Sequence, residues 1–216
     1  MDLEYIDGKL CLTDGEHILT GDFSEKTKRL KHNNLTHELL IKATKLKQKA
    51  GEQIYVVDAT AGMGEDSLLL AAAGYKVTLF ERDKTIAALL KDTIKRGLDN
   101  PELTEIVSRM TLREEDSIEA MKKMADLPEE ERPDVILLDP MFPAREKSSL
   151  VKKKFQLIHH LEKPCENEEE LLNAAMLAKP LRIVIKRPIK GPFLAGVKPS
   201  YSLTGKTVRY DCIVIN

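Results

Sequence analysis

The sequence lacks the features of a disulfide-stabilised, zinc-binding or membrane-spanning protein. Its three cysteines, Cys11, Cys165 and Cys212, are far apart and show no C-x-x-C spacing, so neither a disulfide framework nor a zinc site is expected. No apolar run approaches the roughly 18 residues that a transmembrane helix needs, and the chain begins with the acidic Met1-Asp2-Leu3-Glu4. These absences predict a cytoplasmic protein with no metal and no membrane partner.

Net charge is also nearly absent, because 34 basic residues stand against 35 acidic ones and leave a formal charge of -1. Non-specific affinity for nucleic acid comes mostly from neutralising phosphates, so this balance argues against a protein that coats nucleic acid indiscriminately. Any polyanion site must therefore be local. Two basic stretches, at 26–31 and 145–154, can supply one, although such runs also form solvated helix faces.

The composition indicates a folded protein with one main core. The 216 residues are 42% hydrophobic and 32% charged, and the length suits one domain with an appendage. Residues 1–50 are the expected appendage, with a β-hairpin around Asp7-Gly8 and a helix from Leu35 to Lys49 that follows the capping residues Asn33-Asn34. Residues 51–216 are the expected main domain.

From Ile54 onward, short apolar strands alternate with amphipathic helices, which is typical of a mostly parallel sheet covered on both faces. The expected strands are 54–58, 76–80, 110–113, 134–138 and 181–186. The expected helices are 65–73, 83–96, 116–125, 147–162 and 168–178. Residues 200–214 break the alternation and predict an antiparallel hairpin. That ending is typical of the class I, Rossmann-like α/β fold of methyltransferases that use S-adenosylmethionine (SAM).

A glycine turn closes the first of these strands, at Asp58-Ala59-Thr60-Ala61-Gly62-Met63-Gly64. In open α/β sheets, ligands bind beyond the carboxyl ends of the strands, and glycines there let the backbone approach a ligand. Asp58 can order this loop or contact the cofactor. A tight connection without a ligand is the alternative. However, Glu81 ends the next strand about 20 residues later, where a carboxylate meets ribose hydroxyls.

Residues around this turn favour SAM over NAD. The third glycine of an NAD motif would fall at Ser67, and Glu65 and Asp66 at the start of the helix disfavour a pyrophosphate. SAM carries an ammonium and a sulfonium, with which acidic residues are compatible. Arg82 can pack beside the adenine ring. Asp116-Ser117 lies where an adenine amino group is recognised, or else it only caps a helix.

A second loop, Asp139-Pro140-Met141-Phe142-Pro143, follows the buried strand and reaches the same edge of the sheet. Proline has no N–H, so the loop around Pro140 offers carbonyl acceptors in a stiff arrangement. Asp139 and one such carbonyl can accept hydrogen bonds from an aryl amine and stabilise the positive charge that develops during methylation. Phe142 can stack on the target ring. The alternative is a structural loop with Phe142 in the core.

Cations follow at the same side of the sheet. Lys186-Arg187-Pro188 ends the last central strand, and Lys147, Lys152 and Lys153 come after the proline loop. These cations can frame the mouth of the pocket and hold phosphates on either side of an extruded base. The residues predicted to act in catalysis are Asp139, Pro140 and Phe142.

Five stretches of the chain closely resemble the bacterial RsmJ (YhiQ) family, whose members use SAM to methylate the N2 amine of a guanosine in 16S rRNA. They are Val57–Gly64, Leu79–Arg82, Leu138–Pro143, Lys147–Lys153 and Val184–Pro188. The resemblance implies SAM as cofactor and 16S rRNA or the small ribosomal subunit as partner. It places SAM contacts at Glu65-Asp66, Glu81-Arg82, Asp116-Ser117 and Asp139. The family usually has Arg-Asp where this chain has Glu65-Asp66, so Asp66 is the firmer of the two.

The leading hypothesis is therefore a SAM-dependent rRNA (guanine-N2)-methyltransferase. RNA is favoured over duplex DNA because unpaired or splayed bases are the usual RNA targets and are easier to extrude. The acceptor loop alone does not choose the ring, so an adenine-N6 or small-molecule methyltransferase is an alternative. A non-catalytic RNA- or ribosome-binding module with a vestigial cofactor loop is another.

Overall fold

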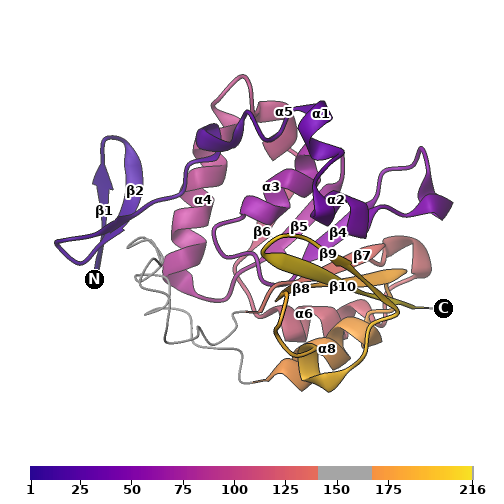
Figure 1. Ribbon diagram of the computed structural model, residues 1–216. Helices are drawn as coiled ribbons and strands as arrows, with labels where there is room; N and C mark the ends of the chain where they lie inside the picture. Colours follow the sequence, from indigo (N-terminus) through magenta and orange to yellow (C-terminus); the bar gives the residue numbers. More distant parts are fainter. Residues whose placement is uncertain (141–166, 216) are drawn as a thin grey trace.

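The computed structural model describes residues 1–140 and 167–215, and the centre of this part of the chain is a seven-stranded sheet (Figure 1). Its strands, in spatial order, are β6 (Met110–Arg113), β5 (Lys76–Phe80), β4 (Tyr55–Asp58), β7 (Val135–Leu138), β8 (Arg182–Pro188), β10 (Val208–Val214) and β9 (Tyr201–Thr204). Strands β6 to β8 are parallel neighbours, and β10 pairs antiparallel with both β8 and β9. The predicted class I, Rossmann-like fold is confirmed.

Helices cover both faces of this sheet. They are α3 (Glu65–Ala72), α4 (Lys84–Leu98) and α5 (Thr104–Val107) on one face, and α6 (Ser117–Met124) and α8 (Glu168–Leu177) on the other. In β7, Val135 and Leu137 pack in the core shared with α3, whereas Ile136 and Leu138 pack in the core shared with α6 and α8. All four side chains are 0% exposed. Burial on both faces explains why the strand is apolar at every position.

The N-terminal hairpin is confirmed and belongs to a small separate sheet. Strands β1 (Asp2–Ile6) and β2 (Lys9–Thr13) pair antiparallel, and β3 (Ile18–Leu19) pairs with β2. Both residues of the Asp7-Gly8 turn have positive φ, at 49° and 76°, as a tight primed turn requires. Figure 1 shows the hairpin beside α4, and the buried Leu12 packs there against Leu89 of that helix.

The expected helix from Leu35 to Lys49 is wrong as a single element. The segment instead forms α1 (His32–Leu35), α2 (Leu39–Thr44) and the 3-10 turn η2 (Lys47–Lys49). Asn33-Asn34 lie inside α1 rather than capping a longer helix, and Glu38 is extended, with ψ at 126°. The buried leucines of this segment all join the core cluster of α3. The division of the chain into an appendage of residues 1–50 and a main domain of residues 51–216 stays a prediction.

Short elements complete the described chain. They are the 3-10 turns η1 (Phe23–Lys26), η3 (Glu129–Glu131) and η4 (Leu194–Gly196). The helix expected at 147–162 lies outside the described residues. Within 1–140 and 167–215, none of the helices has both the length and the apolar composition that crossing a membrane requires.

Candidate active site

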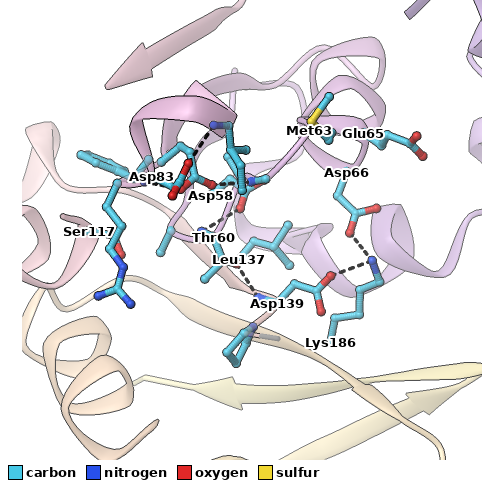
Figure 2. Close-up of a pocket in the computed structure, with 18 of the residues that line it drawn as sticks. Asp58, Thr60, Met63, Glu65, Asp66, Asp83, Ser117, Leu137, Asp139 and Lys186 are labelled. Carbon is cyan, nitrogen blue, oxygen red and sulfur yellow. Dashed lines mark hydrogen bonds and ion pairs between the residues drawn. The ribbon is translucent and has the colours of Figure 1, made fainter. Parts of the chain in front are cut away.

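A cavity of about 1020 Å³ lies at the carboxyl ends of the parallel strands (Figure 2). Its walls are the loops after β4, β5, β6 and β7, the end of β8, and residues 19–29 of the N-terminal segment. Pockets for one drug-sized ligand measure about 300–1,000 Å³. The volume is therefore at the upper limit of this range and is sufficient for a nucleoside cofactor.

The glycine turn and the first two residues of the proline loop, Asp139 and Pro140, meet in this cavity. The Asp139 backbone N–H donates to Thr60 Oγ1 at 2.7 Å, and the Ala59 N–H donates to the Leu137 carbonyl at 3.0 Å. The two loops follow neighbouring parallel strands whose register pairs Asp58 with Leu137, so they leave the sheet side by side. Asp139 and Pro140 thus share one cavity with the cofactor loop.

Asp58, the last residue of β4, holds the glycine turn through hydrogen bonds. Its side chain is almost fully buried and accepts hydrogen bonds from Ser67 Oγ at 2.6 Å and from the Thr60 N–H at 3.2 Å. Burial raises the pKa of Asp58 to about 7, and the nearby charge of Asp66 acts in the same direction. Of the two roles expected for Asp58, the geometry supports loop ordering.

The two glycines of the turn share a backbone conformation that favours glycine, but they have different surroundings. Both have positive φ, 52° at Gly62 and 74° at Gly64. Gly62 lines the cavity, and its N–H donates to Glu81 Oε2 at 3.1 Å. At Gly64 a Cβ atom would in addition lie 2.6 Å from Leu90 Cδ1 of α4, so that side chain would have to move. Gly64 does not line the cavity among the described residues.

Glu81 lies at the end of β5 with its carboxylate fixed by two backbone amides. Oε2 accepts from Gly62 and Oε1 accepts from the Asp83 N–H at 2.8 Å. Burial raises the pKa of Glu81. An ionised carboxylate has about four acceptor positions, so two remain for ribose hydroxyls.

Arg82 and Asp116 face each other at the far end of the cavity. Arg82 Nη1 lies 3.4 Å from Asp116 Oδ2, and both residues line the cavity. Asp116 Oδ1 also accepts a hydrogen bond from the Ile118 N–H at 2.8 Å. Asp116 therefore caps the N-terminus of α6, as one of its two expected roles requires. Ser117, the first residue of α6, lines the cavity beside it.

Lys186 lies between two carboxylates inside the cavity (Figure 2). Its Nζ is 2.7 Å from Asp66 Oδ2 and 2.9 Å from Asp139 Oδ2. The next residue after the registered pair Leu138 and Ile185 is Asp139 on one strand and Lys186 on the other, so the two side chains share the α3 face of the sheet. Asp66 reaches them from the first turn of α3.

This arrangement sets the charge of Asp139. Desolvation raises the pKa of Asp139, and the positive charge of Lys186 opposes that rise. Burial would lower the pKa of Lys186, but the two carboxylates outweigh it, so the pKa of Lys186 is raised. Lys186 is therefore a permanent cation that favours the ionised form of Asp139.

Lys186 and Arg187 were expected to bind phosphates, and their positions in the structure contradict that role. Lys186 is already paired with two carboxylates in the cavity. The Arg187 side chain is 0% exposed, and its Nη2 lies 3.0 Å from Glu168 Oε1. A buried, paired guanidinium cannot reach an RNA phosphate. The other expected RNA-binding residues, Lys147, Lys152 and Lys153, lie outside the described residues, as does the expected catalytic Phe142.

Glu65 is exposed at the rim of the cavity, where its carboxylate lies 2.9 Å from Lys26 Nζ. Sequence reasoning missed three further residues of the site. In the sequence, Thr60 is one residue of the glycine turn and Arg29 one residue of a basic stretch, and neither has a pattern that marks it as part of a site. Tyr210 lines the cavity next to Lys186, its registered partner in β8. Tyr210 belongs to the expected C-terminal hairpin. The sequence does not give the register of that hairpin against the neighbouring strand, so it does not predict that Tyr210 lies beside Lys186.

The cavity wall is strongly acidic. Among its described residues, three are cationic, namely Arg29, Arg82 and Lys186. Ten are carboxylic, namely Asp22, Glu25, Asp58, Glu65, Asp66, Glu81, Asp83, Glu115, Asp116 and Asp139. Such a wall disfavours a pyrophosphate and suits a ligand with an ammonium and a sulfonium. The charge of the wall and its acceptor groups therefore fit SAM.

Comparison with known proteins agrees with this geometry. The family model described as "Putative SAM-dependent methyltransferase" matches residues 8–215. The protein named "Ribosomal RNA small subunit methyltransferase J" of Pseudomonas fluorescens SBW25 is 44% identical over 174 residues, covering 81% of this chain and 65% of the relative. The protein of that name from Thioalkalivibrio sulfidiphilus is 39% identical over 197 residues, covering 91% of this chain and 74% of the relative.

Solved structures give the same result. The crystal structure of a SAM-dependent methyltransferase from Neisseria gonorrhoeae is 31% identical, with a TM-score of 0.75, and the match covers 96% of this chain and 80% of that one. The rRNA methyltransferase AviRa of Streptomyces viridochromogenes, at 16% identity and a TM-score of 0.51 over 87% of this chain and 92% of that one, shares the fold alone.

The chain spans just under two thirds of the length of the Pseudomonas fluorescens relatives and of several others that it matches. The match to the family model begins in the N-terminal hairpin and ends after β10. The expected family is confirmed: the chain belongs to the ribosomal RNA small subunit methyltransferase J family of SAM-dependent methyltransferases.

Proposed function

We propose that the protein uses SAM to methylate the exocyclic N2 amine of a guanosine in 16S rRNA, acting in the cytoplasm. Family membership and the names of the relatives support the small-subunit rRNA substrate. The observation that carries the proposal is the hydrogen bond between Asp139 N–H and Thr60 Oγ1, 2.7 Å long, which holds Asp139 beside the glycine turn in one cavity.

The cofactor half of the cavity comprises Glu81, Gly62, Asp66 and the pair Arg82 and Asp116. Glu81 has acceptor positions left for the ribose hydroxyls, and the acidic wall around Asp66 suits the positive charges of SAM. Arg82 and Asp116 flank the place for the adenine. When bound, SAM supplies an electrophilic methyl group, so the protein needs no covalent intermediate.

The acceptor half acts by positioning and electrostatics. The lone pair of a guanine N2 is delocalised into the ring, and the nitrogen would become positively charged as its bond to the methyl carbon forms and the methyl–sulfur bond of the sulfonium breaks. S-adenosylhomocysteine would be the leaving group, and the nitrogen would then lose one proton to give the neutral methylamine. Asp139 accepts a hydrogen bond from this amine and stabilises the developing charge. Pro140, which has no N–H, leaves the loop rich in carbonyl acceptors. Lys186 favours ionised Asp139 and fixes its orientation.

One experiment tests the activity directly. The purified protein is incubated with labelled SAM and 16S rRNA, as naked RNA and as small subunits, and the rRNA is digested to nucleosides for mass analysis. N2-methylguanosine is the expected product. N6-methyladenosine, or label transferred only to small molecules, would favour the other methyltransferases. Absence of SAM binding by calorimetry would favour a non-catalytic RNA-binding module.

A further inference from the structure

The first of the two basic stretches belongs to a longer segment of the described chain that is rich in basic charge. Residues 26–49 contain eight Lys or Arg and a single acidic residue, Glu38. The whole chain has 34 basic and 35 acidic residues, so the remaining residues hold 26 basic against 34 acidic. A protein with almost no net charge thus carries a strongly positive segment on an acidic body.

The segment exposes its lysines because its apolar side chains are used in the core. Leu30, Leu35, Leu40, Ala43 and Leu46 are all buried in the cluster that contains α3 and one face of the sheet. Most of the basic residues between them are consequently exposed to solvent. Figure 1 shows this stretch, from α1 through α2, lying outside the sheet on the side of α3.

Most of these charges are not used inside the protein. Lys26 pairs with Glu65, Arg29 with Glu38, and Lys49 with Asp134. By contrast, five exposed lysines of the segment, Lys28, Lys31, Lys42, Lys45 and Lys47, form no ion pair with any described residue. We call these five, together with Lys206, the lysine face.

Lys206 joins the face through the turn between β9 and β10. A Cβ atom on Gly205 would lie 2.7 Å from Leu39 Cδ1 at the start of α2, so the turn packs closely on the segment. Lys206 is exposed and is also without an ion pair in the described part of the chain. The next residues, Thr207 and Val208, line the cavity.

The face borders the cavity at one end and leads away from it. Arg29, between Lys28 and Lys31, lines the cavity. At the other end, the Lys45 carbonyl accepts from Arg182 Nη1 at 2.9 Å, at the start of β8 and therefore at the opposite edge of the sheet. A polyanion with one unit in the cavity can continue along the whole face.

We propose that the lysine face binds the phosphate backbone of the RNA substrate, with the phosphates that flank the target nucleotide at Lys28, Lys31 and Lys206. This rests on the proposed function, because it takes the target to be a nucleotide of an RNA strand. Exposed lysines neutralise phosphates and contribute affinity without reading sequence.

The chemistry of the face favours RNA over other polyanionic partners. None of the large apolar side chains exposed by the described chain lies in residues 26–49. A helix that binds a membrane surface inserts apolar or aromatic side chains between its lysines. Protein interfaces are depleted in lysine and enriched in aromatic residues at their centre. A phosphate backbone needs neither anchor.

The test compares two triple variants in binding in-vitro transcribed 16S rRNA over a range of salt concentrations. K28Q/K31Q/K42Q removes charge from the lysine face. K95Q/K123Q/K179Q removes the same charge from exposed positions in α4, in α6 and after α8. The first variant should bind at least about tenfold more weakly at low salt. The slope of log K against log salt concentration should be smaller in magnitude by about 2. The control should match the wild type, and calorimetric SAM affinity should be unchanged in both.

Two results would overturn the docking surface: an unchanged slope in K28Q/K31Q/K42Q, or an equal loss in the control. Preferential sedimentation of the wild type with phosphatidylserine vesicles in the presence of competing 16S rRNA would overturn it as well. RNA binding is measured without turnover. A lost slope in a protein that methylates no rRNA would therefore support the surface while refuting the proposed activity.

Discussion

Asp139 is the single residue on which the proposed chemistry depends most. It lines the cavity, its N–H is held by Thr60, and its carboxylate lies beside Lys186. Asp139→Ala should lower the rate of methyl transfer by about 10²-fold or more, since a positioned acid–base or electrostatic group contributes about that much. SAM affinity, measured by calorimetry, should stay within about one order of magnitude. The exposed Asp99→Ala is the matched control, and unchanged turnover in Asp139→Ala would remove Asp139 from the mechanism.

Lys186 should act on the reaction through Asp139. Without the lysine, desolvation and the negative charge of Asp66 both raise the pKa of Asp139, and only the smaller effect of the Arg187 charge opposes them. The ionised carboxylate is the form that accepts from the amine, so Lys186→Met should move the acidic limb of the kcat/KM profile to higher pH. Lys186→Arg keeps the charge and should restore most of the wild-type profile. An unshifted limb in Lys186→Met would mean that the lysine has only a structural role.

The adjacent residues Lys186 and Arg187 show what sequence reasoning can reach and where it fails. Both were assigned to the pocket mouth because they follow one strand. Successive side chains of a strand point to opposite faces. Lys186 therefore points to the α3 face and the cavity, while Arg187 points to the other side and pairs with Glu168. The alternation was readable from the sequence, but which face holds the cavity was not.

At the scale of elements, prediction succeeded where burial on both faces dictates the residue types. β7 reads as an uninterrupted apolar run and forms a strand near its expected bounds. The segment 35–49 has helical spacing but forms two short helices and a 3-10 turn, because contacts distant in sequence decide its path. Arg29, for example, donates two hydrogen bonds to Glu38, at 2.6 and 2.8 Å, just where the expected helix is interrupted.

The loop after β8 depends on one arginine of β10. Arg209 Nη1 donates to the carbonyls of Pro188, Ile189 and Gly191 at 3.1, 2.7 and 2.9 Å, and its Nε lies 2.9 Å from Asp211 Oδ1. Arg209 and Asp211 are both buried. Arg209→Met should therefore lower the free energy of unfolding by about 3–5 kcal/mol, as expected when a buried ion pair loses one partner. Urea denaturation measures this.

A double variant separates the charge from the packing in that pair. If the uncompensated carboxylate is the main cause, Arg209→Met combined with Asp211→Asn should recover part of the lost stability. The two changes should then be clearly non-additive, as for residues in direct contact. Additive losses would instead assign the effect to the carbonyls of the loop.

At the scale of the whole molecule, charge is divided between an acidic cavity and a basic segment beside it. The cavity wall suits a cationic cofactor, and the lysine face suits phosphates, so the two ligands of the proposed reaction are attracted to different surfaces. Composition alone gave a net charge of -1 and concealed this division. Its detection required knowing which basic side chains are exposed and which are paired.

Asp58 links the site to the stability of the whole protein. Its pKa is raised from 3.8 to about 7, chiefly by burial, so the folded state binds a proton more tightly than the unfolded state. The stabilisation from protonated Asp58 is complete below pH 4 and is lost as the pH rises to about 7. At about 1.4 kcal/mol per pH unit, this loss amounts to about 4 kcal/mol. Asp58→Asn, which has no charge to bury, should lack this decline.

Denaturation in urea at several pH values between 4 and 8 measures the difference. The wild type should lose stability relative to Asp58→Asn as the pH rises, and the two curves should run parallel above pH 7, where Asp58 is ionised. Asp99→Asn, at an exposed position, should follow the wild type throughout. Parallel curves for the wild type and Asp58→Asn over the whole range would show that Asp58 is ionised at every pH tested. In that case Ser67 and the Thr60 N–H, which donate to it, outweigh its burial.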